Sequence, residues 1–278
     1  MESNLMCQTQ LLDADSQIQQ ETAYYRLAVN YALLGNIDSS YYFLDKFITV
    51  AEDDRVALVD KDFDILRQDS LKWQILINKI EKNYLSCINE ATNPELALKL
   101  FYLGIDDQRY RLYLPSLGQI PMDKDSNGVV RYIIYGPFKE QIEFEKIIKK
   151  YGFPTITMVG KSGSSYAFLL LQHSSIIKRY YKKVKKAFKL GDINPLDFAL
   201  LTDRYLMDCH RKQLYGTQFY QTNRTRRKYP NELILYPVKD FKNVNDRRFK
   251  IGFTSTVEEY TESFGSNHII PQTYYEKK

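Results

Sequence analysis

The sequence has few of the side chains that bind metals or cross-link a chain. Its 278 residues include three cysteines and three histidines. They are spread along the whole chain, at Cys7, Cys87, Cys209, His173, His210 and His268. An odd number of distant cysteines does not form a disulfide framework, and a zinc site would need almost all of these positions as ligands. We therefore predict no metal site, and the sequence leaves any other cofactor unknown.

Long apolar runs are also missing. The longest spans residues 167–171 and is far shorter than the roughly 20 residues that cross a bilayer. The first residues, MESNLMCQTQLLDADSQ, lack the charged and then apolar pattern of a signal peptide. We therefore expect a cytoplasmic protein, or an exported one whose leader is absent from this chain.

Glycine and proline are scarce, with 12 and 9 residues, which excludes a collagen-like or low-complexity chain. Aromatic side chains are plentiful, with 23 Tyr and 15 Phe, and can build a well-packed core. Charge is uneven: residues 1–104 carry 9 Lys and Arg against 16 Asp and Glu, whereas residues 105–278 carry 30 against 18. An acidic front and a basic back indicate two modules.

The first module, residues 1–92, is predicted to be helical. Apolar side chains follow the helical period on both sides of Gly35, which predicts a hairpin of two helices over residues 23–50, with Asp38 capping the second. A second, degenerate unit is expected over residues 62–88. The hairpin resembles a tetratricopeptide repeat at five positions: Leu27, Ala28, Tyr31, Gly35 and Ser40. That resemblance implies a surface for a protein or peptide partner, and a single clear repeat must pack on the domain behind it.

The second module, residues 93–265, is predicted to be mostly helical with a small β hairpin, and residues 266–278 to be a tail. Helices are expected over residues 95–114, 139–151, 163–173, 175–189 and 195–209. Residues 213–220 and 232–236 have the composition of two strands joined by a basic loop. The predicted fold class is therefore mainly α.

His173 and Asp203 each fall on the apolar face of a predicted helix. A buried carboxylate needs a charged partner or several hydrogen bonds, because its desolvation alone is costly. The candidate partners are His173, Arg204, Arg111 and Gln213. Two interpretations stay open: a satisfied core network that orients the helices, or a His–Asp general-base pair at a cleft, with an arginine stabilising charge.

A second unusual string, QLYGTQ, occupies residues 213–218. A glycine inside a strand-like segment indicates a bulge or a close backbone approach. The long amides could hydrogen-bond a substrate or buried backbone groups. For a functional site, the candidate substrate-binding residues are Arg111, Gln172, Gln213, Tyr215, Thr217 and Gln218.

The order Gln172-His173, then Asp203-Arg204, then QLYGTQ resembles an uncharacterised bacterial domain family, a domain of unknown function. The resemblance covers about residues 95–262 and is specific in order and spacing. It implies the extent of a domain, with helical-repeat segments often in front of it, and no activity.

Basic side chains crowd the predicted helix over residues 175–189. Seven lie within twelve residues: Lys178, Arg179, Lys182, Lys183, Lys185, Lys186 and Lys189. They are typical of a solvated face of a core helix, or of a surface for an acidic partner. Because no nucleic-acid-binding motif accompanies them, nucleic acid is not the partner we expect.

Two classes of function therefore remain. In the first, the protein is a hydrolase or transferase acting on an anionic or amide-containing small molecule or peptide, with His173 as acid/base, Asp203 as its orienting group and Arg204 as charge stabiliser. In the second, it is a non-enzymatic protein- or peptide-binding module whose polar network is architectural. Convergence of these side chains at an open cleft would favour the enzyme, and a sealed, mutually satisfied network would favour the binding module.

Overall fold

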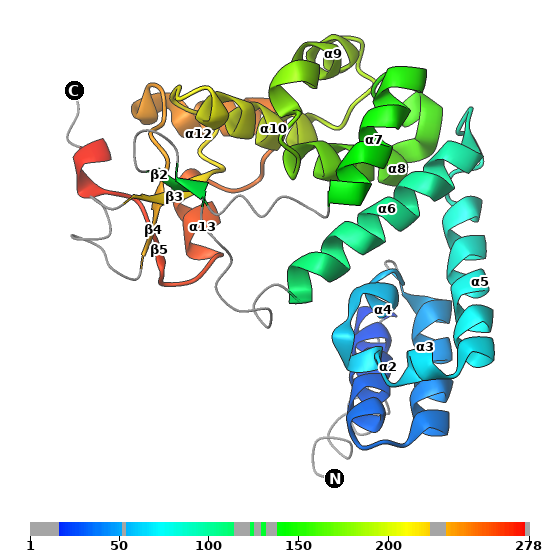
Figure 1. Ribbon diagram of the computed structural model, residues 1–278. Helices are drawn as coiled ribbons and strands as arrows, with labels where there is room; N and C mark the ends of the chain where they lie inside the picture. The colour runs from blue at the N-terminus through cyan, green and yellow to red at the C-terminus, as the bar shows by residue number, and fades with distance from the viewer. Residues whose placement is uncertain are drawn as a thin grey trace. The chain divides into compact units, whose positions relative to one another are not determined.

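The computed structural model describes residues 17–51, 54–113, 123–124, 129–131, 138–222 and 232–275, and Figure 1 shows their helices and strands. The chain divides into two compact units, and helix α6 (Pro94–Tyr113) contributes to both. The first unit contains residues up to Asn89 together with the end of α6 from Ile105, and the second contains residues 90–104 and the described residues after α6.

The N-terminal unit opens with the predicted helical hairpin, α2 (Gln17–Leu33) and α3 (Ile37–Val50). Gly35 lies in the turn with a φ of +72°, which a residue without a Cβ adopts at little cost. Ser40 is buried between the helices, where its Oγ donates to the Ala28 carbonyl at 2.7 Å. The predicted cap was wrong: Asn36 caps α3 by accepting the Ser39 N–H, while Asp38 already lies in the first turn.

The segment after this hairpin is made of short elements that lead into one long helix. They are α4 (Val56–Val59), the 3₁₀ turns η1 (Lys61–Phe63) and η2 (Leu66–Gln68), and α5 (Ser70–Ser86). Asp60 and Asp69 start separate elements, because each carboxylate accepts a backbone N–H two or three residues ahead. The helical character of the unit is confirmed, and its assignment to the tetratricopeptide repeat stays a prediction.

Helices also dominate the C-terminal unit. After the first turns of α6 come α7 (Phe138–Tyr151), α8 (Ile156–Gln172), α9 (Ile177–Lys189) and α10 (Pro195–Asp208), followed by η4 (Phe241–Asn243), α12 (Val244–Ile251), α13 (Val257–Glu262) and η5 (Gln272–Tyr274). The four helices that the sequence predicts between residues 139 and 209 are confirmed. α8 is broken at Gly160, whose φ of 73° and ψ of 171° lie in a region that side chains avoid.

A small sheet completes this unit. Its strands run in the order β1 (Asp123–Lys124), β2 (Val129–Arg131), β3 (Phe219–Thr222), β4 (Leu233–Leu235) and β5 (His268–Ile269). Neighbours pair antiparallel except β4 and β5, which are parallel. The predicted hairpin corresponds to β3 and β4, although β3 starts six residues later than expected because residues 213–218 form the loop described below.

The sheet shares a core with the short helices beside it in Figure 1. This core contains Leu235 and Val238 around β4, Val244 of α12 and Val257 of α13. Residues after 265, expected to form a tail, take part in it: β5 joins the sheet, and the Tyr274 hydroxyl donates to the Leu235 carbonyl at 2.8 Å. Within the described residues, no helix is long and apolar enough to span a membrane.

Candidate functional site

Asp203 lies on the inner face of α10 and is completely buried. Its Oδ1 accepts the N–H of Leu214 at 2.7 Å and that of Tyr215 at 3.1 Å. Its Oδ2 accepts the N–H and the hydroxyl of Thr217 at 3.1 and 3.0 Å, and shares the Tyr215 N–H. The carboxylate therefore holds the QLYGTQ loop against α10 and has its lone pairs directed at that loop.

Gln213 is also completely buried, and the oxygen and the nitrogen of its side-chain amide each make two hydrogen bonds. Its Oε1 accepts the N–H groups of Thr217 at 2.8 Å and of Gln218 at 2.9 Å. Its Nε2 donates to the carbonyls of Gln218 at 3.0 Å and of Tyr236 at 2.6 Å. Its backbone forms a bridge to Val238, next to β4. These four hydrogen bonds from one side chain take the place of strand pairing in residues 213–218, so the Gln213 amide stabilises the fold.

Two adjacent arginines of α12 donate hydrogen bonds to carbonyl groups of the same loop. Arg248 is completely buried, donates to the carbonyls of Tyr215 at 2.8 Å and Ser255 at 2.9 Å, and stacks on Phe253. Arg247 donates to the Leu214 carbonyl at 3.0 Å. The loop thus has its N–H groups bound by Asp203 and carbonyl groups bound by the arginines.

Gly216 allows the loop to pass close to α13. Its φ is +70°, and a Cβ at this position would lie 2.6 Å from the Val257 side chain. Both the backbone angle and the close approach require glycine. The bulge that the sequence predicted is here a tight loop closed by polar side chains.

Burial dominates the electrostatics of this network. It raises the pKa of Asp203 to about 6, even though the hydrogen bonds from the loop act in the opposite direction. Burial also raises the pKa of Tyr215, and the nearby Asp203 carboxylate adds to that effect. The lowered pKa of the Arg248 guanidinium has the same cause, burial, which Asp203 partly offsets.

The other predicted catalytic residues lie outside this network. His173 follows the end of α8 and is half-buried, and its backbone N–H donates to Leu169. None of the hydrogen bonds that Asp203 accepts comes from His173 or Arg204. Gln172 is also half-buried at the end of α8. Arg111 belongs to α6, and its side chain lies outside the described part of the structure.

Gln218 and Tyr215, two further predicted substrate-binding residues, also lie in the loop that Asp203 binds. The Gln218 amide is buried and donates to the Thr217 hydroxyl at 3.1 Å. Tyr215 is only half-buried, and its backbone N–H is bound by Asp203. The structure therefore brings together Asp203 with Gln213, Tyr215, Thr217 and Gln218, and forms from them a closed internal network.

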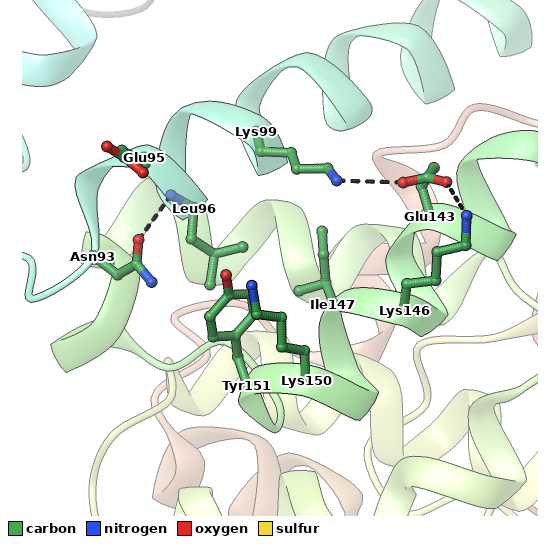
Figure 2. Close-up of a pocket in the computed structure, with 9 residues that line it drawn as sticks. All are labelled: Asn93, Glu95, Leu96, Lys99, Glu143, Lys146, Ile147, Lys150 and Tyr151. Carbon is green, nitrogen blue, oxygen red and sulfur yellow. Dashed lines mark hydrogen bonds and ion pairs between the residues drawn. The ribbon is translucent and has the colours of Figure 1, made fainter.

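A pocket that sequence reasoning missed lies between the first turns of α6 and the last turns of α7 (Figure 2). Its volume is about 340 Å³. The lining residues are Asn93, Glu95, Leu96, Lys99, Glu143, Lys146, Ile147, Lys150 and Tyr151. The basic end of α7 is visible in the sequence, but only packing places it across from Asn93 and Leu96.

Charges are arranged unevenly around this pocket. Glu143 accepts from Lys146 at 2.6 Å and from Lys99 at 3.3 Å, and the lysines, Lys146 first, lower the pKa of Glu143. The Lys150 ammonium lies 4.7 Å from the centre of the Tyr151 ring. At one end of the pocket Glu143 is thus paired with Lys99 and Lys146, and Lys150 lies at the other end.

The basic helix α9 buries its apolar face and exposes its lysines. Ile177, Tyr180, Tyr181 and Val184 are buried. Arg179 forms an ion pair with Glu145 of α7, which also accepts from the Tyr180 hydroxyl at 3.0 Å. The apolar face is therefore occupied by the core, and the lysines lie on the exposed face.

No group of three or more His, Cys, Asp or Glu residues suited to a metal ion occurs among the described residues. Searches of curated proteins and of solved structures found no match to the chain. The prediction of an uncharacterised domain family is confirmed by a comparison with family models. Residues 137–267, just under half of the chain, match the model of a family of unknown function, DUF6624.

Proposed function

We propose that the protein binds a peptide or another protein without chemical turnover, and that the network around Asp203 holds the DUF6624 domain in shape. The observation that carries this proposal is the saturation of Asp203 and Gln213 by groups of the same chain. A general base, or the carboxylate that orients one, must direct a lone pair at a reacting group or at its catalytic partner. Asp203 directs its lone pairs at a loop backbone.

Exposed aliphatic side chains in the N-terminal unit support a binding role. Five are more than 60% exposed: Ile18 at 69%, Leu33 at 66%, Leu34 at 62%, Leu71 at 73% and Ile75 at 62%. Leu71 and Ile75 are one helical turn apart on α5 and share one face. Apolar side chains that gather on a surface favour contact with a partner. We place the peptide or protein ligand on this face of α5.

Retention and turnover can be measured in one experiment. The full chain is immobilised and incubated with a synthetic pool of random peptides, and mass spectrometry identifies both retained and chemically changed peptides. We expect retained, unchanged peptides. The variant Leu71→Ser/Ile75→Ser should weaken their binding about tenfold, as for a contact of more than about 1 kcal/mol. Leu190→Ser, which changes an equally exposed side chain on the other unit, is the matched control.

The enzyme alternative gives the opposite result in the same experiment. A peptide cleaved or modified by the wild type, but left intact by His173→Ala or Arg204→Gln, would contradict the proposal and establish a catalytic site. Equal retention by wild type and Leu71→Ser/Ile75→Ser would contradict the placement on α5. Thermal unfolding of each variant checks that the chain remains folded.

A further inference from the structure

We propose that the pocket between α6 and α7 binds a ligand that carries one carboxylate beside an apolar group, as the C-terminal residue of a peptide does. The proposal goes beyond the peptide-binding function placed on α5, because it assigns a separate site within the C-terminal unit. It rests on the donors, the charge and the apolar surface that meet in this pocket.

Three hydrogen-bond donors line one end of the pocket. In Figure 2 the hydroxyl of Tyr151 and the ammonium of Lys150 point toward Leu96, and the amide of Asn93 lies beside Leu96. Asn93 uses its Oδ1 to accept the Leu96 N–H at 3.0 Å, which fixes the amide and leaves Nδ2 as the outward donor. Among the described residues, these three donor groups have no acceptor. A carboxylate, with two oxygens and about four lone-pair sites, can accept from all three.

The net charge at this end of the pocket suits a monoanion. The lining contains three lysines and two glutamates, a net charge of +1. Glu143 is paired with Lys99 and Lys146, so among the described residues Lys150 is the lysine of this pocket without a carboxylate partner. The carboxylate of Glu95 points away from the three donors in Figure 2. The N-terminal end of α6, where Asn93 lies, adds the positive end of a helix dipole. A doubly charged phosphate would exceed this charge, whereas a carboxylate matches it.

The floor of the pocket provides the apolar contact. Leu96, beside the three donors, and Ile147, between them and the Glu143 group in Figure 2, are 4% and 3% exposed. A volume of about 340 Å³ is at the small end of ligand pockets. It accommodates one apolar residue with its carboxylate rather than a long chain. The aromatic ring of Tyr151 closes one side.

The test uses N-acetyl-L-leucine as the probe, titrated into the ¹⁵N-labelled full chain and followed by NMR. We expect saturable shifts at the amides of Asn93, Lys150 and Tyr151, with a Kd of about 1–10 mM for a ligand of this size. N-acetyl-L-leucinamide, which lacks the charge, should bind about tenfold more weakly. Inorganic phosphate should also bind more weakly than the leucine derivative.

Matched variants assign the effect to the pocket. Lys150→Gln and Tyr151→Phe should each weaken binding of the acid about five- to tenfold, with unchanged melting temperatures. Lys182→Gln removes the same charge from α9, outside the pocket, and should leave the Kd unchanged. Equal binding of acid and amide, equal binding by Lys150→Gln, or shifts at other residues alone would overturn the proposal. The tripeptide Ala-Ala-Leu, compared with the acetylated residue, distinguishes a peptide terminus from a small free acid as the source of the carboxylate.

Discussion

At the scale of single residues, Asp203 shows how a candidate catalytic group can be committed to the fold. Its burial is what the helical period predicts, and the structure confirms it. The partners of Asp203 are not the predicted His173 or arginines but backbone N–H groups from Leu214 to Thr217, 11 to 14 residues later in the chain. These N–H groups point at the carboxylate because Gly216 allows the loop to turn. A polar residue on an apolar helix face therefore indicates a network, and the identity of its partners decides between chemistry and architecture.

A pH dependence of stability follows from the raised pKa of Asp203. Burial raises it from 3.8 to about 6, so the folded state binds this proton more tightly than the unfolded state. The contribution of Asp203 to the free energy of unfolding should therefore be full below about pH 4 and fall by about 3 kcal/mol as the pH rises through about 6. Urea unfolding of wild type and Asp203→Asn between pH 4 and 7 measures it.

Only the difference between the two proteins isolates this group, because other residues titrate in the same range. The stability of wild type minus that of Asp203→Asn should decrease from pH 4 to pH 6. A difference that stays constant, or that increases with pH, would show that the loop donors keep the pKa of Asp203 at or below its ordinary value.

At the scale of elements, packing between helices depends on small residues at particular positions. Gly104 of α6 faces the ring of Tyr166 on α8, where a Cβ would lie 1.9 Å from a ring carbon. Tyr166 is buried and its ring makes an edge contact with Phe101 at 5.9 Å, so it has little space to move. The glycine is therefore required by the neighbouring helix rather than by its own backbone.

Gly104→Ala should consequently destabilise the protein by about 1–3 kcal/mol, the cost of an overpacked core. Intrinsic helix propensity alone predicts a gain of about 1 kcal/mol from the same change. Chemical denaturation gives the sign. The double variant Gly104→Ala/Tyr166→Leu, in a cycle with both single variants, should show a favourable coupling. A stabilised single variant would contradict the close contact of α6 and α8.

The helix α9 shows how much of an element can be predicted. Its apolar positions repeat at the helical period, and Ile177, Tyr180 and Val184 on that face are buried. The aromatic stacks that join it to α10, Tyr181 on Tyr205 and Phe188 on Phe198, both at 3.9 Å, depend on the relative position of two helices. Periodicity gives the face of a helix, and only packing gives the partner of that face.

At the scale of the whole molecule, residues that look like a tail belong to the core of the sheet. β5 pairs in parallel with β4, and Ile270 and Tyr274 pack on the cluster around Leu235. The sequence gives little sign of this, because a two-residue strand is too short for a period. Its pairing is set by contacts with a strand more than 30 residues away.

Removal of residues 266–278 should therefore lower the free energy of unfolding by about 3 kcal/mol or more, since it exposes the sheet core and removes a hydrogen bond to Leu235. Thermal and urea unfolding of the shortened chain measure this loss. A chain that lacks only residues 276–278 is the control and should differ from wild type by less than about 0.5 kcal/mol. An unchanged midpoint after the longer deletion would show that β5 and η5 contribute nothing to stability.

The sequence by itself determined the helical character, the burial of Asp203, the presence of a family domain and the bounds of most main helices, although α2 and α8 start six and seven residues before the predicted positions. These features depend on local periodicity, on chain order, or on the apolar surroundings of one residue. The tertiary structure alone decided the partners of Asp203 and Gln213, the inclusion of the last residues in the sheet, and the pocket between α6 and α7. Each of these joins groups that are distant in the chain, and their meeting depends on the packing of whole elements.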